Sequence, residues 1–333
     1  MEETQQLTEK EYRSLEKLSY SVLKDFLCKG RRYYYRKYIL QDGVKDETNQ
    51  AMLVGSLVDS ILYSPQEIES TYHFSDASKA PEGKGGLFVL ELFRLMTTNP
   101  DQEFMTAFEE AYKLSGSSDK LYSSFLSKFE GSNLETYYLS LLESQNKIVV
   151  SLQDYNNAQK IANELKFGRN TKHLFEMPFL SQVPIFFEYR GKEFKSKLDY
   201  IGFDHEQKII YPKDLKVTFD VEGFPDAYGK AGYFIQEYLY QIAVEQWAKE
   251  NYPDYYVEKF EFIVADSILY VDPLIYNIEV QNGSLQHGFT GKYGRYYQGV
   301  DKIMDNISWH TENNVWSSSK ENYELMGKRY EVI

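Results

Sequence analysis

The sequence has almost no cysteine, no long apolar segment and no excess of positive charge. Cys28 is the only cysteine in 333 residues, which excludes an internal disulfide and any metal or iron–sulfur site that needs several thiolates. No run of about 18 apolar residues is present, so we expect no membrane span. The opening segment MEETQQLTEKEYRSLEKLSYSVL is charged and lacks the apolar core of a signal peptide, so we expect a cytoplasmic protein.

Two further classes of site are missing from the sequence. There is no Gly-x-x-x-x-Gly-Lys-Ser/Thr motif, so we expect no nucleotide cofactor, and ATP-driven unwinding would need a partner. The sequence does not favour a hydrolase that uses a histidine-bound metal, because the histidines are scattered without paired metal-ligand spacing. They are His73, His173, His205, His287 and His310. The net charge of -13 argues against a surface that binds polyanions nonspecifically, but positive charge can still be confined to one groove.

The hydrophobic pattern predicts one α/β domain in which helices flank a central mixed β-sheet, with a helical insertion. We assign residues 1–74 to an N-terminal helical part, residues 75–150 to the insertion and residues 151–333 to the core. Within the core, residues 182–220 predict three strands, with turns at Arg190-Gly191 and near Asp204-His205. The remaining core elements are a helix over 226–249, two strands over 257–280 and a terminal helix over 291–307.

One predicted strand, IIYPKDLKVT, carries an acid and a base in its second half. Asp214 and Lys216 are two residues apart, so both side chains leave the same face of an extended chain. Asp199 ends the charged face of the preceding strand, and it can join them if the two strands are neighbours. Carboxylate oxygens suit a hard cation such as Mg²⁺. The spacing alone is also typical of a solvated strand face or a simple ion pair.

The helix that follows carries a polar aromatic stripe. Tyr233, Gln236 and Tyr240 fall at i, i+3 and i+7, on one helical face. Ile235 and Leu239 lie largely on another side. Such a stripe favours contact with a phosphate or a base, and an ordinary amphipathic helix is the alternative.

Taken together, KLDYIG, KDLKVT and the helical Gln-x-x-x-Tyr motif resemble the PD-(D/E)XK nuclease superfamily, in particular its RecB/RecE-type branch, which includes phage recombination exonucleases. The resemblance implies a restriction-endonuclease-like core. It also implies that Asp199 and Asp214 bind Mg²⁺ or Mn²⁺ and that Lys216 is the catalytic lysine. Gln236 and Tyr240 would position the DNA strand or the catalytic groups.

The N-terminal part extends the resemblance. LSYSVLKDFLCKGRRYYYRKYI is similar to the opening of that family, and GSLVD takes the place of its Gly-x-x-x-His. Asp59 stands where the family has a metal-binding His, so the resemblance implies that Asp59 and the Leu215 carbonyl are further ligands; a buried ion-pair partner is the alternative for Asp59. We expect basic residues to follow the DNA backbone, with an ordinary solvated face as the alternative; they are Arg31, Arg32, Arg36, Lys37 and Lys197.

The resemblance therefore implies a Mg²⁺-dependent DNA exonuclease for phage-type recombination or DNA processing, in the host cytoplasm if the chain is phage-encoded, without an iron–sulfur cluster. An endonuclease with the same chemistry is one alternative. A noncatalytic DNA-binding or recombination-scaffold protein is the other. DNA is the expected partner, and a single-strand annealing or single-strand-binding protein and a second copy of the chain are candidate partners.

Overall fold

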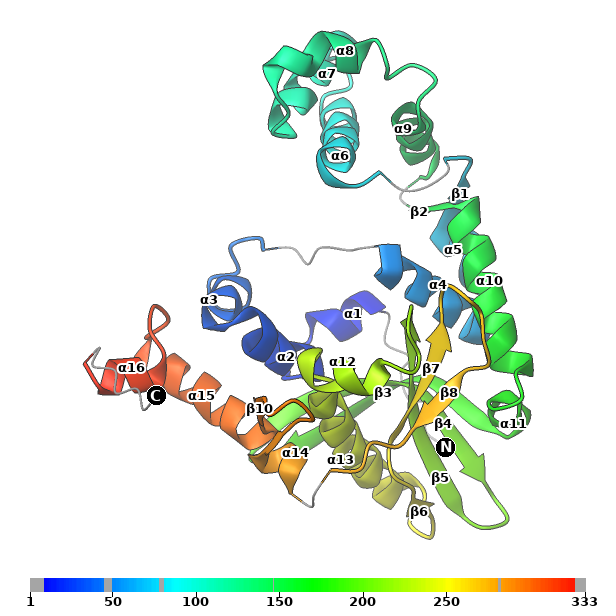
Figure 1. Ribbon diagram of the computed structural model, residues 1–333, viewed down its shortest axis with the longest axis vertical. Coiled ribbons are helices and arrows are strands. Elements are labelled where there is room, and N and C mark those ends of the chain that lie inside the picture. Colours follow the sequence, from blue (N-terminus) through cyan, green and yellow to red (C-terminus); the bar gives the residue numbers. More distant parts are fainter. Residues whose placement is uncertain (1–8, 45–49, 78–80, 146, 281–282, 327–333) are drawn as a thin grey trace. The chain divides into compact units, whose positions relative to one another are not determined.

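The computed structural model describes residues 9–44, 50–77, 81–145, 147–280 and 283–326, and it divides into two compact units (Figure 1). The first unit consists of residues 1–47 and 165–333, and the second of residues 48–164. The second unit is longer at both ends than the insertion predicted over 75–150. Within the described ranges, no helix is long and apolar enough to cross a membrane.

The first unit is built on a mixed β-sheet, as predicted. Its strands are β3 (Phe179–Tyr189), β4 (Lys192–Asp204), β5 (Ile209–Thr218), β6 (Tyr256–Val257), β7 (Glu261–Asp266) and β8 (Leu274–Tyr276). The order is β3-β4-β5-β7-β8, and β6 pairs with β5. The β5–β6 and β5–β7 pairs are parallel and the others are antiparallel. The β3–β4 hairpin turns at Arg190 and Gly191, both with positive φ, as the sequence predicts.

Helices cover this sheet and complete its core. The helices of the unit are α1 (Glu9–Ser14), α2 (Tyr20–Lys29), α3 (Arg31–Tyr34), the π-helix η1 (Tyr35–Ile39), α11 (Lys172–Glu176), α12 (Phe224–Lys230), α13 (Tyr233–Asn251), α14 (Ser284–His287), α15 (Val300–Asn313) and α16 (Lys320–Glu324). α13 packs along β3, β4 and β5, α2 packs on α13, and α15 packs on α2 (Figure 1). Leu23, Leu239 and Ile303 are fully buried in the shared core. Helices flanking a mixed sheet confirm the predicted fold class.

The structure corrects two predicted helices. The helix predicted over 226–249 is broken, because Gly232 has a φ of 72° and separates α12 from α13. The helix predicted over 291–307 begins only at Val300. The segment ahead of it forms the hairpin of β9 (Gly288–Thr290) and β10 (Tyr296–Gln298). Glycines at 291 and 294 and two adjacent tyrosines favour such a hairpin over a helix.

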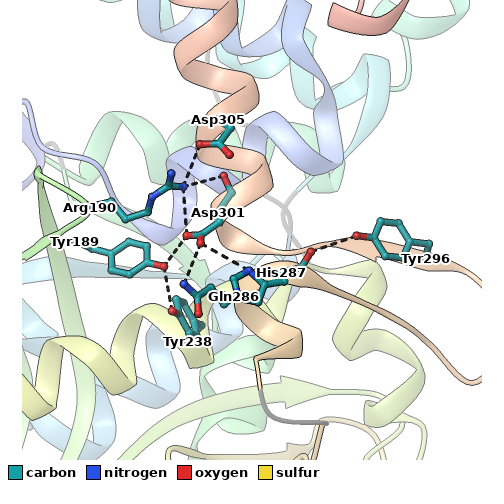
Figure 2. Close-up of polar contacts among 8 residues, drawn as sticks. All are labelled: Tyr189, Arg190, Tyr238, Gln286, His287, Tyr296, Asp301 and Asp305. Atoms are coloured by element: carbon teal, nitrogen blue, oxygen red, sulfur yellow. Dashed lines mark hydrogen bonds and ion pairs between the residues drawn. The ribbon is translucent and has the colours of Figure 1, made fainter.

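A hydrogen-bonded cluster around Asp301 fastens the C-terminal elements to the sheet (Figure 2). The Tyr189 hydroxyl donates to Asp301 Oδ1 at 2.6 Å, and Gln286 Nε2 donates to Oδ2 at 2.9 Å. Arg190 lies between Asp301 and Asp305, with its Nη1 at 3.0 Å from Asp305 Oδ1. Because Asp301 lies in the first turn of α15, its charge also complements the helix dipole. This cluster ties β3, α14 and α15 together.

The second unit is mainly helical around a small parallel pair of strands. Its elements are α4 (Gln50–Tyr63), the 3-10 helix η2 (Pro65–Glu67), α5 (Ile68–Thr71), β1 (Tyr72–Ser75), α6 (Gly83–Thr98), α7 (Phe104–Leu114), the 3-10 helix η3 (Asp119–Leu121), α8 (Tyr122–Leu126), α9 (Asn133–Glu143), β2 (Ile148–Ser151) and α10 (Leu152–Phe167), whose last turn belongs to the first unit. Phe88 and Phe108 are fully buried at the centre of its core. Within the predicted insertion, residues 83–98, 104–114, 122–126 and 133–143 are α-helical.

Candidate active site

The candidate site lies on β5, where its ladder with β4 ends on one side and its ladder with β7 begins on the other. The β4–β5 ladder ends at the pair Tyr200 and Lys213, and from Lys213 onward β5 pairs with β7. The next residues in the same register are Asp199 and Asp214. At this point the Leu215 N–H donates to Asp199 Oδ2 at 3.1 Å. The separation of the two strands therefore opens room for two facing carboxylates.

Pro212, just before this point, lies inside β5 opposite Ile201 of β4, with an unbroken register. Because proline lacks the N–H for a ladder bond, it is ordinarily found at the start of a strand, on an edge strand or at a bulge. On its other side β5 pairs with β6 at 209–210 and with β7 from 213 onward. Pro212 falls between these two pairings, where no described strand requires its N–H.

Asp214 is the buried centre of the site, with 2% of its surface exposed. Gln236 Nε2 donates to Asp214 Oδ1 at 2.6 Å, and Lys216 Nζ forms an ion pair with Oδ2. Burial raises the pKa of Asp214, the charge of Asp199 raises it further and Lys216 opposes both, with a result of about 8. The structure thus brings together four residues that the sequence analysis selected.

Lys216 is held as a cation against aromatic rings. Its Nζ lies 5.2 Å from the ring centre of Tyr233 and 5.7 Å from that of Phe262. Burial acts to lower its pKa, but the Asp214 and Asp199 carboxylates outweigh burial and raise it. Lys216 therefore carries its charge at neutral pH.

Tyr240, which the resemblance pairs with Gln236, also lies on α13 and is buried. It is 8% exposed and packs edge-on against Tyr20 of α2, with 6.5 Å between ring centres. Burial and then the Asp214 charge raise the pKa of Tyr240 well above its usual range, so its phenol stays protonated. In the part of the chain that the structure describes, Tyr20 Oη and Gln236 Oε1 are buried without a hydrogen-bond partner. Two such atoms in one site are suited to a ligand.

Sequence reasoning missed Gln182, which orients Asp199. Its Nε2 donates to Asp199 Oδ1 at 3.1 Å. Gln182 has a φ of 53°, a left-handed conformation that is uncommon outside glycine and that is often found at functional sites. A single glutamine in an edge strand gives no signal in the sequence. Sequence reasoning also missed Tyr20, although it lies in the N-terminal segment that carries part of the resemblance.

The predicted metal ligands fit a hard cation in part. Asp199, Asp214 and the Leu215 carbonyl are the predicted oxygen ligands in the first unit, and a buried carboxylate with a raised pKa beside a second one favours a cation. No group of three or more His, Cys, Asp or Glu that could hold a metal occurs among the described residues. Asp59 lies on α4 in the second unit and is half-buried, so its ligand role stays a prediction.

All five basic residues predicted to bind DNA contact the protein itself. Arg36 pairs with Asp42 at 2.8 Å and Lys37 with the buried Asp25 at 2.8 Å. The other contacts are Lys197 Nζ to Glu9 Oε2 at 2.7 Å, and Nη2 of Arg31 and Arg32 to the Ser317 carbonyl at 3.2 and 3.3 Å. Their contact with DNA stays a prediction.

The chain was compared with protein families, curated proteins and solved structures. No protein-family model and no curated protein matches the chain. Among solved structures, a crystal structure from Eubacterium rectale described as a "putative exonuclease" is similar over 98% of this chain and 96% of that chain, with a TM-score of 0.46 and 18% sequence identity. A likeness of this size supports no functional assignment.

Proposed function

We propose that the first unit is a divalent-metal-dependent deoxyribonuclease that hydrolyses phosphodiester bonds, acting as an exonuclease in phage-type DNA recombination or processing. The observation that carries the proposal is the convergence of Asp199, Asp214, Lys216 and Gln236 where β4 and β5 separate. An acid pair beside a lysine cation is suited to a polyanionic substrate whose reaction develops further negative charge. A simple solvated strand face does not bury its acid to 2% exposure.

Asp199, Asp214 and the Leu215 carbonyl would hold Mg²⁺ or Mn²⁺. When bound, such an ion acts as a Lewis acid on the phosphate and lowers the pKa of bound water. The small number of protein ligands suits Mg²⁺, which keeps several of its waters. Gln182 and Gln236 hold the two carboxylates in place through one hydrogen bond each.

The other residues would act on the phosphate itself. The Lys216 ammonium would stabilise negative charge that develops on the phosphate oxygens. Tyr20 and Tyr240 have phenols whose pKa values are raised well above their usual range, so both remain hydrogen-bond donors. A donor that cannot ionise near neutral pH keeps its interaction with an anionic oxygen across the working pH range.

A noncatalytic DNA-binding or recombination-scaffold protein is the alternative. The lack of a three-residue metal cluster among the described residues favours it. Endonuclease activity would use the same residues, so it differs from exonuclease activity only in the substrates cleaved.

Digestion of end-labelled linear DNA and closed circular DNA, with Mg²⁺, Mn²⁺ or EDTA, distinguishes an exonuclease, an endonuclease and a noncatalytic DNA-binding protein. An exonuclease releases label only from linear DNA, and an endonuclease also cuts the circle. Asp214→Asn should abolish cleavage, whereas Asp254→Asn, on an exposed side chain, should not change it. Salt-sensitive binding without cleavage of either DNA would favour the noncatalytic reading.

A further inference from the structure

A second candidate site lies in the first unit, outside the acid cluster. It is a cavity of about 380 Å³ between the C-terminal ends of α2 and α12, the β9–β10 hairpin, α15 and α16. We call it the Arg295 pocket. Its volume lies within the range of small-molecule sites.

The Arg295 pocket is cationic although the protein carries a net charge of -13. Its lining contains the basic residues Arg31, Lys230, Arg295 and Lys320 and the acid Glu321. No ion pair to Arg31, Lys230 or Arg295 occurs among the described residues, and Arg31 Nε is buried there without a partner. Most of the other cations near α2 are already paired, as Lys37 is with Asp25. The pocket therefore selects an anion.

The pocket also offers an aromatic surface and fixed walls. Tyr296 is 59% exposed on the hairpin, and Arg295 lies over the Tyr297 ring at 5.4 Å. Figure 2 shows the Tyr296 hydroxyl donating to the His287 carbonyl, at 3.3 Å, next to the Asp301 cluster that anchors α14 and α15. An exposed tyrosine face beside unpaired cations is the combination that binds bases and phosphates of single strands.

One face of α2 links the pocket to the candidate active site. Tyr20, Lys24 and Cys28 are spaced four residues apart, so they lie on one side of the helix. Tyr20 packs against Tyr240 in the active site, and Cys28 lines the pocket. The rise from Tyr20 to Cys28 is about 12 Å, or roughly three to four nucleotides of a stacked strand.

We propose that the Arg295 pocket binds a phosphate group of a nucleic-acid strand, with the adjoining base on Tyr296, three to four nucleotides from the bond that is cleaved. The distance to the cleaved bond rests on the proposed function, whereas anion capture by the pocket does not. The phosphate is either internal to the strand or at its end, and both have the chemistry that the pocket recognises.

The test is binding of a labelled 12-nucleotide single-stranded DNA, with Ca²⁺ in place of Mg²⁺ and strand integrity checked on a gel. Arg295→Gln and Lys230→Gln change exposed side chains, so folding should be retained. Each should weaken binding about 3- to 10-fold and reduce the slope of log affinity against log salt by about 0.7. The control Lys249→Gln removes the same charge about 24 Å along α13 from Tyr233 and should bind as the wild type does.

Cys28 supplies a readout that is independent of activity, because it is the chain's only cysteine and is exposed at the pocket. The oligonucleotide should slow maleimide labelling of Cys28 in the wild type, and less so in Arg295→Gln. Comparing the binding of oligonucleotides with and without a terminal phosphate then shows whether the pocket binds the phosphate at the end of the strand or an internal one.

Equal binding by both pocket variants, the control and the wild type would overturn the pocket proposal, and so would a wild-type protein that does not bind the oligonucleotide. The proposed function fails separately, if Asp214→Asn cleaves DNA as the wild type does. Loss of binding in the pocket variants would then still support the pocket.

Discussion

Glu237, one residue beyond Gln236 on α13, should make the stability of the first unit depend on pH. It is half-buried and accepts a hydrogen bond of 2.5 Å from the buried Tyr228 hydroxyl. Burial, which outweighs the opposing effects of Tyr228 and Lys259, raises the pKa of Glu237 from 4.5 to about 7. The folded state therefore holds a proton on this carboxyl that the unfolded state has already lost between those two pH values.

The sign and size follow from proton linkage. Below pH 4.5 the carboxyl is protonated in both states, and as pH rises through 7 the stabilisation from the neutral buried form is lost. The difference between these two pKa values corresponds to at most about 3.4 kcal/mol of unfolding free energy. Glu237→Gln keeps a neutral acceptor for Tyr228, so relative to this variant the wild type should lose up to about 3.4 kcal/mol between pH 4.5 and pH 8.

Urea denaturation followed by tryptophan fluorescence measures this, because Trp247, Trp309 and Trp316 all lie in the first unit. Glu250→Gln, on the exposed end of the same helix, is the matched control and should follow the wild type at every pH. A constant difference between wild type and Glu237→Gln across this range would refute the reasoning about burial.

Three further predictions concern the site and its support. Lys216→Met should lower the cleavage rate about 100- to 1000-fold with little loss of folding, measured by label release and by circular dichroism. Gln182→Ala frees the Asp199 carboxylate and should lower activity or metal affinity about 10-fold; unchanged Mg²⁺ dependence would count against the positioning role. Lys195→Met leaves the carbonyls of Tyr12, Arg13 and Leu15 without the buried Lys195 Nζ, and should lower the free energy of unfolding by about 2–3 kcal/mol in urea titrations.

Local patterns in the sequence determined the elements and the chemistry they carry. The alternation of residues 182–218 specifies three strands, and the spacing of Asp214 and Lys216 puts both on one face, because side chains alternate along any strand. The three-, four- and seven-residue spacings around Gln236 likewise face one way on any helix. Such patterns act over a few residues, so they can be recognised without knowing the fold.

Only the tertiary structure decided how these elements meet. The register that sets Asp199 opposite Asp214, and the position along β5 where its pairing with β4 ends and its pairing with β7 on the other side begins, depend on pairing between distant segments. The hydrogen bond from Gln182 to Asp199 joins residues of two strands, and Arg31, Lys230 and Arg295 have no ion pair within the described residues although Glu321 lines the same pocket. Charge pairing and strand register are properties of neighbours in space, which a local pattern does not encode.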